Sequence, residues 1–140
     1  MPIPFAFARN LQDASLNPVA FTLPAAASTS TSSTTVDLGA YQFQPEILEL
    51  ELSVPALSTV IVPAASTVTY LIETSAVSNF ATIDQTLMSE VVTGAGAGVV
   101  AFLKRARLNP NCAQDLRFRV AFGAACTTGA AFSATPSLRF

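Results

Sequence analysis

The stretch STVTYLIETSAVSNF, residues 66–80, predicts a central β-strand followed by a structured loop. Alternate side chains of an extended chain point to opposite faces. Val68, Tyr70 and Ile72 therefore share one apolar face, and Glu73 lies on the other face. Small polar residues then interrupt the alternation until Phe80, which we expect to hold the loop against the core. No residue type in this stretch suggests catalysis.

Several flanking segments repeat the same alternation. Residues 47–54 and 116–122 are the clearest strands: every second side chain is apolar, and the others are mostly polar or charged. Shorter strands are expected at 59–62, 90–93, 99–108 and 132–140, where Pro136 indicates an edge position or a bulge. About eight short strands with turns between them, and no long amphipathic helix, are typical of an antiparallel β-sandwich or jelly roll.

The first 35 residues differ from the rest of the chain. Prolines prevent long regular structure in residues 1–27, and residues 28–35 are a Ser/Thr run typical of a flexible linker or an exposed edge strand. We therefore divide the chain into an extended N-terminal arm with linker, 1–35, and a β-sandwich domain, 36–140. The arm is too apolar for a free tail and is expected to lie on its own domain or on a neighbouring subunit. Its candidate interface residues are Phe5, Phe7, Leu11, Leu16, Phe21 and Leu23.

The composition indicates a surface poor in charge. The chain has 140 residues, which predicts one domain, and only 11% of them are charged, whereas 51% are hydrophobic. An ordinary soluble domain has about 25% charged residues. Ser and Thr can cover the surface, or large patches can be buried against other chains, and we expect both. With seven basic residues and a net charge of −2, the chain has no electrostatic footprint for nucleic acid.

The residue types argue against catalysis, cofactors and metal ions. The chain has no His, so neither a Ser-His-Asp nor a Cys-His arrangement can form within it. Glu49 and Glu51 have a spacing that suggests a glycosidase pair, but a solvated strand face explains them better. The glycines at 94–98 match no phosphate-binding motif and instead indicate positive-φ turns or close backbone approach. We expect no enzyme activity, no cofactor and no metal.

Two further features have simple structural interpretations. Cys112 and Cys126 are expected to be free, partly buried thiols; a bridge between them would instead suit a secreted β-protein such as a pilus or surface-layer subunit. Residues 52–72 carry no charge, as a membrane span would, but Pro55 and Pro63 divide them. Two strands with a turn between them explain this run better, so we expect no membrane partner.

The order of these features resembles a known family. The motifs are TTVDLG at 34–39, LELELSVP at 48–55, TVTYLIETS at 67–75 with SNF at 78–80, the glycine turn at 94–98, RARL at 105–108 and DLRFRV at 115–120. Over residues 34–140 the chain resembles the small capsid cement, or decoration, proteins of tailed bacteriophages. It departs from that pattern at Asn109, which precedes Pro110, and at Phe118, which follows Arg117 directly.

The resemblance implies a structural virion protein with a β-sandwich or jelly-roll fold. Such a protein would form a small homo-oligomer, a trimer as first choice and a dimer as second, on the outer capsid surface. It would clamp adjacent major capsid protein subunits, with the apolar arm as the candidate contact. The alternative is a jelly-roll receptor- or carbohydrate-binding module of a virion or surface appendage. Such modules usually offer aromatic platforms, whereas this chain has two tyrosines and no Trp.

Overall fold

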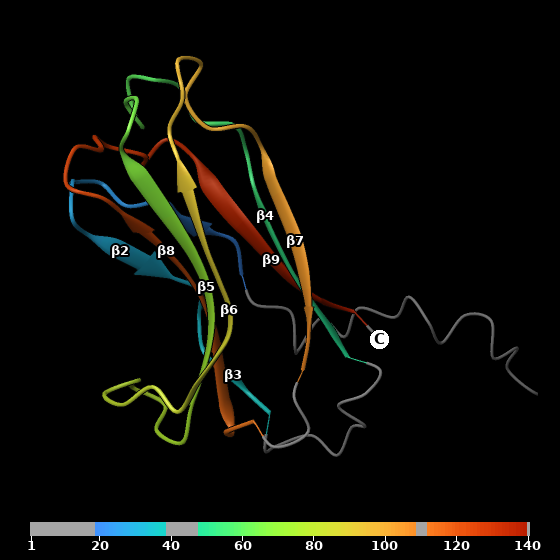
Figure 1. Ribbon diagram of the computed structural model, residues 1–140. Helices are drawn as coiled ribbons and strands as arrows, with labels where there is room; N and C mark the ends of the chain where they lie inside the picture. Colours follow the sequence, from blue (N-terminus) through green and yellow to red (C-terminus); the bar gives the residue numbers. More distant parts are fainter. Residues whose placement is uncertain (1–18, 39–47, 109–111, 140) are drawn as a thin grey trace, which may run out of the picture.

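The computed structural model describes residues 19–38, 48–108 and 112–139. These residues form nine β-strands, all paired antiparallel, and no helix, and the strands lie in two sheets (Figure 1). The predicted all-β sandwich is confirmed. The uncharged run at 52–72 forms parts of two strands, as expected, and no helix in the described part of the chain is long and apolar enough to span a membrane.

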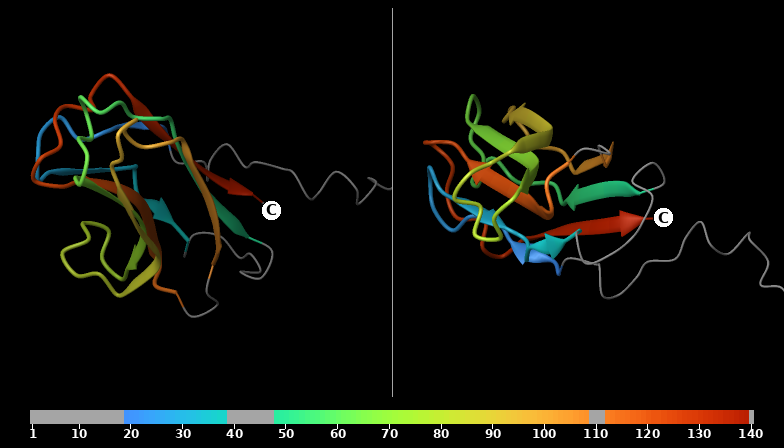
Figure 2. Two further views of the ribbon diagram at one scale, coloured as in Figure 1. Left: turned by 45° about the horizontal axis from the view of Figure 1, so that its top comes forward. Right: turned by 90° about the horizontal axis from the view of Figure 1, so that it is seen from below.

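Each sheet has a simple strand order. The first sheet has the order β1-β9-β4-β7, formed by Phe21–Thr22, Ser133–Arg139, Glu49–Val54 and Phe102–Arg107. The second has the order β2-β8-β5-β6, formed by Ser30–Ser32, Asp115–Phe122, Thr67–Ser75 and Gln85–Thr93. A further strand, β3 (Val36–Asp37), also pairs with β8. Figure 2 shows the two sheets as separate layers.

The strands β2 and β3 form one interrupted edge strand. Both pair with β8, and Ser33 lies between them. The Ser33 N–H donates to the Phe118 carbonyl at 2.9 Å, and the Phe118 N–H donates to Ser33 Oγ at 3.1 Å. Hydrogen bonds therefore continue across the interruption, as they do around a β-bulge. The Ser/Thr run was expected to be either a flexible linker or an exposed edge strand, and Ser30–Ser32 form an edge strand. Part of the segment assigned to the linker therefore belongs to the second sheet.

The chain is folded in half, and its two halves pair strand by strand. β1 pairs with β9, β2 and β3 with β8, β4 with β7, and β5 with β6, so that each pair encloses the next. The pairs β4–β9 and β5–β8 join these units into sheets. The innermost connection is the loop 76–84 between β5 and β6. The stretch 66–80 therefore contains a central strand and leads into the middle turn of the fold.

The core lies between the two sheets and consists of the inward-facing side chains. Tyr70 on β5 and Phe118 on β8 are the bulkiest of them, and both are fully buried. The Tyr70 ring stacks on Phe102 of the opposite sheet, with 4.0 Å between ring centroids. All the predicted inward positions of the three clearest strands are buried: Leu48, Leu50, Leu52, Val54, Val68, Tyr70, Ile72, Leu116, Phe118, Val120 and Phe122.

Some predicted boundaries are corrected. Residues 59–62 form a turn rather than a strand, because the N–H groups of Ile61 and Val62 both donate to the Ser58 carbonyl. β5 continues through residues 74 and 75, and 85–93 is one continuous strand. Pro136 lies in β9 opposite Leu52 of β4, which covers one edge of the strand. The two-residue β1 covers the other edge only at Ser133 and Ala134. Its missing N–H is tolerated at such a locally open edge.

The glycines at 94–98 allow two loops to approach each other closely, as the sequence indicated. Gly98 has φ 85°, and a Cβ there would lie 2.1 Å from the Leu57 carbonyl oxygen. A Cβ on Gly96 would meet nothing within 4 Å. We expect Gly98→Ala to lower the free energy of unfolding by about 2–3 kcal/mol. Gly96→Ala, the matched control, should change it by less than about 0.5 kcal/mol in urea titrations. Equal effects of the two would contradict the loop geometry.

Tyr70 predicts a loss of stability at alkaline pH. Its buried hydroxyl has no hydrogen-bond partner in the described structure, and burial, with a smaller contribution from Cys126, raises its pKa to about 12. The unfolded chain ionises near pH 10, so stability is complete below pH 10 and falls as the pH rises towards 12. The loss should reach about 2 kcal/mol at pH 12.

The Tyr70→Phe variant isolates that effect. It removes an unsatisfied hydroxyl, so its stability at pH 7 should equal or exceed that of the parent by up to about 1 kcal/mol. Its decline between pH 10 and 12 should be smaller than that of the parent chain. Tyr41→Phe is the control, because it leaves Tyr70 in place. An alkaline decline that is identical in all three proteins, measured by thermal unfolding, would contradict this origin.

Candidate functional site

Most charged side chains of the described strands face outward, whereas Lys104 and Glu90, which are in register with the buried Leu52 and Tyr70, form an ion pair between the edge strands β7 and β6. No cluster of His, Cys, Asp or Glu that could hold a metal ion occurs among residues 19–38, 48–108 and 112–139. Instead, two outward-facing glutamates, Glu51 and Glu73, each bind two arginines of the flanking strands. These two clusters and the loop 76–84 hold most of the side-chain hydrogen bonds described below.

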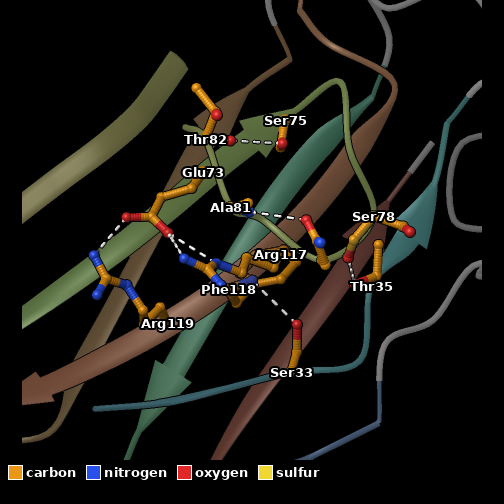
Figure 3. Close-up of polar contacts among 11 residues, drawn as sticks. Ser33, Thr35, Glu73, Ser75, Ser78, Ala81, Thr82, Arg117, Phe118 and Arg119 are labelled. Atoms are coloured by element: carbon orange, nitrogen blue, oxygen red, sulfur yellow. Dashed lines mark hydrogen bonds and ion pairs between the residues drawn. The ribbon is translucent and has the colours of Figure 1, made fainter. Parts of the chain in front are cut away.

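The first cluster, the Glu73 cluster, lies on the second sheet. Glu73 on β5 accepts hydrogen bonds from Arg117 Nε at 2.9 Å and from Arg119 Nη2 at 2.6 Å, both from β8 (Figure 3). The Glu73 side chain is only 3% exposed, and those of Arg117 and Arg119 are 19% and 29% exposed. A carboxylate this deeply buried requires such charge-assisted hydrogen bonds. The cluster therefore ties β5 firmly to β8 on the outer face.

Side-chain hydrogen bonds brace the loop 76–84 at its base. The Ser75 hydroxyl donates to the Thr82 carbonyl at 2.7 Å and accepts the Val77 N–H at 3.0 Å. Across the same base, the Ala76 N–H donates to Asp84 Oδ2 at 2.6 Å. Short polar side chains thus satisfy backbone groups that the ladder no longer pairs. The expected structured loop is confirmed.

Phe80 holds this loop to the outer face rather than to the core. The centroid of its ring lies 4.3 Å from the Arg117 guanidinium carbon, and the side chain is buried but separate from the core cluster. The expected anchoring in the core is therefore wrong, because the loop folds over the outward face of β8, where a flat guanidinium offers a stacking surface. Phe80 also has φ 53°, an unfavourable region for a bulky residue. The Thr35 hydroxyl donates a hydrogen bond to the Ser78 carbonyl at 3.3 Å, which is a second contact between this loop and the rest of the sandwich (Figure 3).

The second cluster, the Glu51 cluster, repeats this arrangement on the first sheet. Glu51 on β4 accepts hydrogen bonds from Arg105 Nε of β7 at 2.7 Å and from Arg139 Nη2 of β9 at 2.9 Å. The hydrogen bond to Glu51 raises the pKa of Arg105. The expected solvated face is wrong for Glu51, which is buried between the two arginines, whereas Glu49 is half-buried.

The structure describes only part of the candidate interface predicted from the sequence. Phe5, Phe7, Leu11 and Leu16 lie outside the described residues. Phe21 pairs in β1 and packs against the core, and Leu23 is 1% exposed within it. The last two therefore pack on their own domain.

The Glu73 cluster and its contact with Phe80 were missed from the sequence, although one signal pointed to them. Glu73 faces outward on its strand, and Arg117 and Arg119 alternate outward on another. Pairing these two strands in register would have brought the opposite charges together. Both cysteines are free, as expected; Cys112 is partly exposed and Cys126 is buried, and burial raises the pKa of each thiol.

The described residues form an all-β, two-sheet sandwich in which ion pairs connect neighbouring strands on both outer faces. No protein-family model, curated protein or solved structure matches the chain.

Proposed function

We propose that the chain is a non-enzymatic structural protein of a tailed-bacteriophage virion. It binds the outside of the capsid as a homo-oligomer and cements adjacent major capsid protein subunits, stabilising the shell. The proposal rests on the sequence motifs between residues 34 and 120 that resemble capsid cement proteins. The structural observation that carries it furthest is the nested pairing of the strands.

We infer from that pairing that the sandwich is a jelly roll. We take β2 and β3 as one interrupted strand. The first strand, β1, then pairs with the last, β9; β2 and β3 pair with β8, β4 with β7 and β5 with β6. A long antiparallel hairpin wound into two sheets has this order. Jelly rolls are frequent among viral capsid domains and lectins.

The motifs that carry the resemblance divide between the two sheets: LELELSVP and RARL pair in the first, and the motifs described next are neighbours in the second. TVTYLIETS is β5, and DLRFRV opens β8, its direct neighbour in the second sheet. SNF lies in the loop that Phe80 attaches to Arg117 of that same strand.

Co-sedimentation with mature capsids that lack the protein tests the proposal. We expect the full chain to bind saturably and at near-stoichiometric copy number to the outer surface. A full chain that stays in the supernatant over a micromolar range would overturn the proposal.

A truncated chain tests the arm separately. Deleting residues 1–27 would remove β1 from the first sheet and Leu23 from the core, and so would destabilise the fold. A deletion of residues 1–18 keeps both and is therefore the informative variant. It should weaken capsid binding at least about tenfold, because the apolar arm would no longer add buried area. Equal binding by both proteins would remove the arm from the proposal and leave capsid binding in place.

The alternative function is a receptor- or carbohydrate-binding module, since lectins share the inferred strand order. The large hydrophobic side chains exposed in the described residues are all Val, Ile or Leu, with no aromatic ring among them. A sugar-binding surface usually needs such rings, so this alternative ranks second. Reproducible binding to defined glycans on an array, without capsid binding, would reverse the order.

A further inference from the structure

One end of the sandwich is built from four loops without any charged residue. We call it the loop end; it consists of residues 23–29, 55–66, 94–101 and 123–132. The charged residues of the described structure all lie on strands, except Asp84 in the loop 76–84 at the opposite end (Figure 1). The exposed surface of this end therefore lacks the charged side chains that are usual on protein surfaces.

The four loops are fixed to one another. Leu57 and Val99 exchange backbone hydrogen bonds at 2.8 and 2.9 Å, which join 55–66 to 94–101. The Thr127 N–H donates to the Ile61 carbonyl, and the Gly129 N–H donates to the Pro24 carbonyl, so the other two loops join the same unit. A surface braced in this way loses little conformational entropy when it binds a partner.

The exposed side chains of the loop end are small, apart from two valines. Ala, Ser, Thr, Gly and Pro make up the rest of its exposed positions, and side chains of this size cost little entropy to immobilise. Val60 and Val100 are 74% and 80% exposed, the two highest values among the large hydrophobic residues described. They lie on the two loops that the Leu57–Val99 bridge joins. Each would gain substantially from burial in a contact.

We propose that the loop end is a contact between two copies of this chain, related by a two-fold axis. The missing charge favours this occupant over a charged partner. Around a symmetry axis a surface meets its own copy, so charges of one sign would face each other and repel, by several kcal/mol when desolvated. A surface with no charge avoids that cost, whereas it gives a charged foreign partner nothing to complement. The absence of basic and exposed aromatic residues from these loops also disfavours a lipid surface.

The position of the loop end determines the symmetry. A single patch that contacts itself is isologous, and it closes as a two-fold dimer. Because the patch lies at an end of the sandwich, the two copies would meet end to end. The loops 76–84 would then lie at the far ends of the dimer, and both outer-face clusters would remain uncovered. Such a dimer would form in the isolated protein, whether or not a capsid is present.

Sedimentation velocity of the full chain between about 1 and 500 µM tests this contact. We expect a concentration-dependent monomer–dimer equilibrium, and we expect Val60→Asp and Val100→Asp each to weaken it at least about tenfold, since each places like charges across the axis. Val91→Asp and Leu103→Asp are the matched controls, because these residues are 60% and 61% exposed on the edge strands β6 and β7. They should change the dimer constant by less than about threefold.

Three outcomes would overturn the proposal. The chain could stay monomeric at all concentrations, a trimer could persist in the Val60 and Val100 variants, or all four substitutions could weaken association equally. Thermal unfolding of every variant shows whether it is folded; at such exposed positions the midpoints should stay within a few degrees of the parent value. Because no capsid is used, failure here is distinguishable from failure of the proposed capsid function.

Discussion

Phe118→Ala is expected to lower the free energy of unfolding by about 4 kcal/mol, the largest effect of any substitution considered. Phe118 is fully buried on β8, and it pairs with Ile72 of β5 at the centre of the second sheet. Truncation removes an aromatic ring from a close-packed interior and leaves a cavity that the two sheets cannot easily close. Urea titration followed by far-UV circular dichroism measures the difference.

Phe80→Ala is the matched comparison, since it truncates the same residue type outside the core. Phe80 packs on Arg117 at the outer face, so its loss should cost about 1–2 kcal/mol, for the stacking contact and part of the buried ring. A core position for Phe80, the expectation from the sequence, would give a loss of about 3 kcal/mol or more for this change. If the two substitutions cost the same, the distinction between core and outer face would be wrong.

The second large effect is expected at Glu73. Its carboxylate is almost completely buried, and Arg117 and Arg119 are themselves mostly covered. Glu73→Ala leaves two arginines close together without their counter-charge, and removal of one partner from a buried pair typically costs about 3–5 kcal/mol. Because both arginines retain some contact with water, we expect about 3 kcal/mol.

Two other glutamates turn this prediction into a graded series. Glu51 is also buried, but Arg105 and Arg139 are 55% and 42% exposed and can rehydrate, so Glu51→Ala should cost about 1–2 kcal/mol. Glu90 and Lys104 are both about half-exposed, and Glu90→Ala should cost less than about 1 kcal/mol. The order Glu73, Glu51, Glu90 should hold in urea titrations at pH 7. A different order would show that exposure of the cations does not control the loss.

Much of the fold follows from local patterns. Period-two alternation at 48–54, 67–73 and 116–122 identified the inward faces correctly, because a residue shift would move every apolar side chain to the solvent face. The glycines at 94–98 were interpreted correctly because one of them requires a positive φ. These features depend on a residue and its neighbours in the chain.

Features that depend on pairing between distant segments were not predictable in this way. The Ser/Thr run at 28–35 has no apolar face, and its edge strand is specified by hydrogen bonds to β8, about ninety residues away. The burial of Glu51 and Glu73 depends on which strands flank them, which alternation does not reveal. Phe80 was placed in the core because an isolated aromatic residue after a strand usually lies there. Its stacking on Arg117 requires knowledge of the strand order.

The most direct test of the proposed function is the composition of purified tailed-phage particles from the same source as the chain. Quantitative mass spectrometry of mature particles gives its copy number relative to the major capsid protein, and mild protease treatment of intact particles shows whether it lies outside the shell. We expect a near-stoichiometric ratio and cleavage from outside. Absence from mature particles, or a chain protected inside the shell, would contradict it.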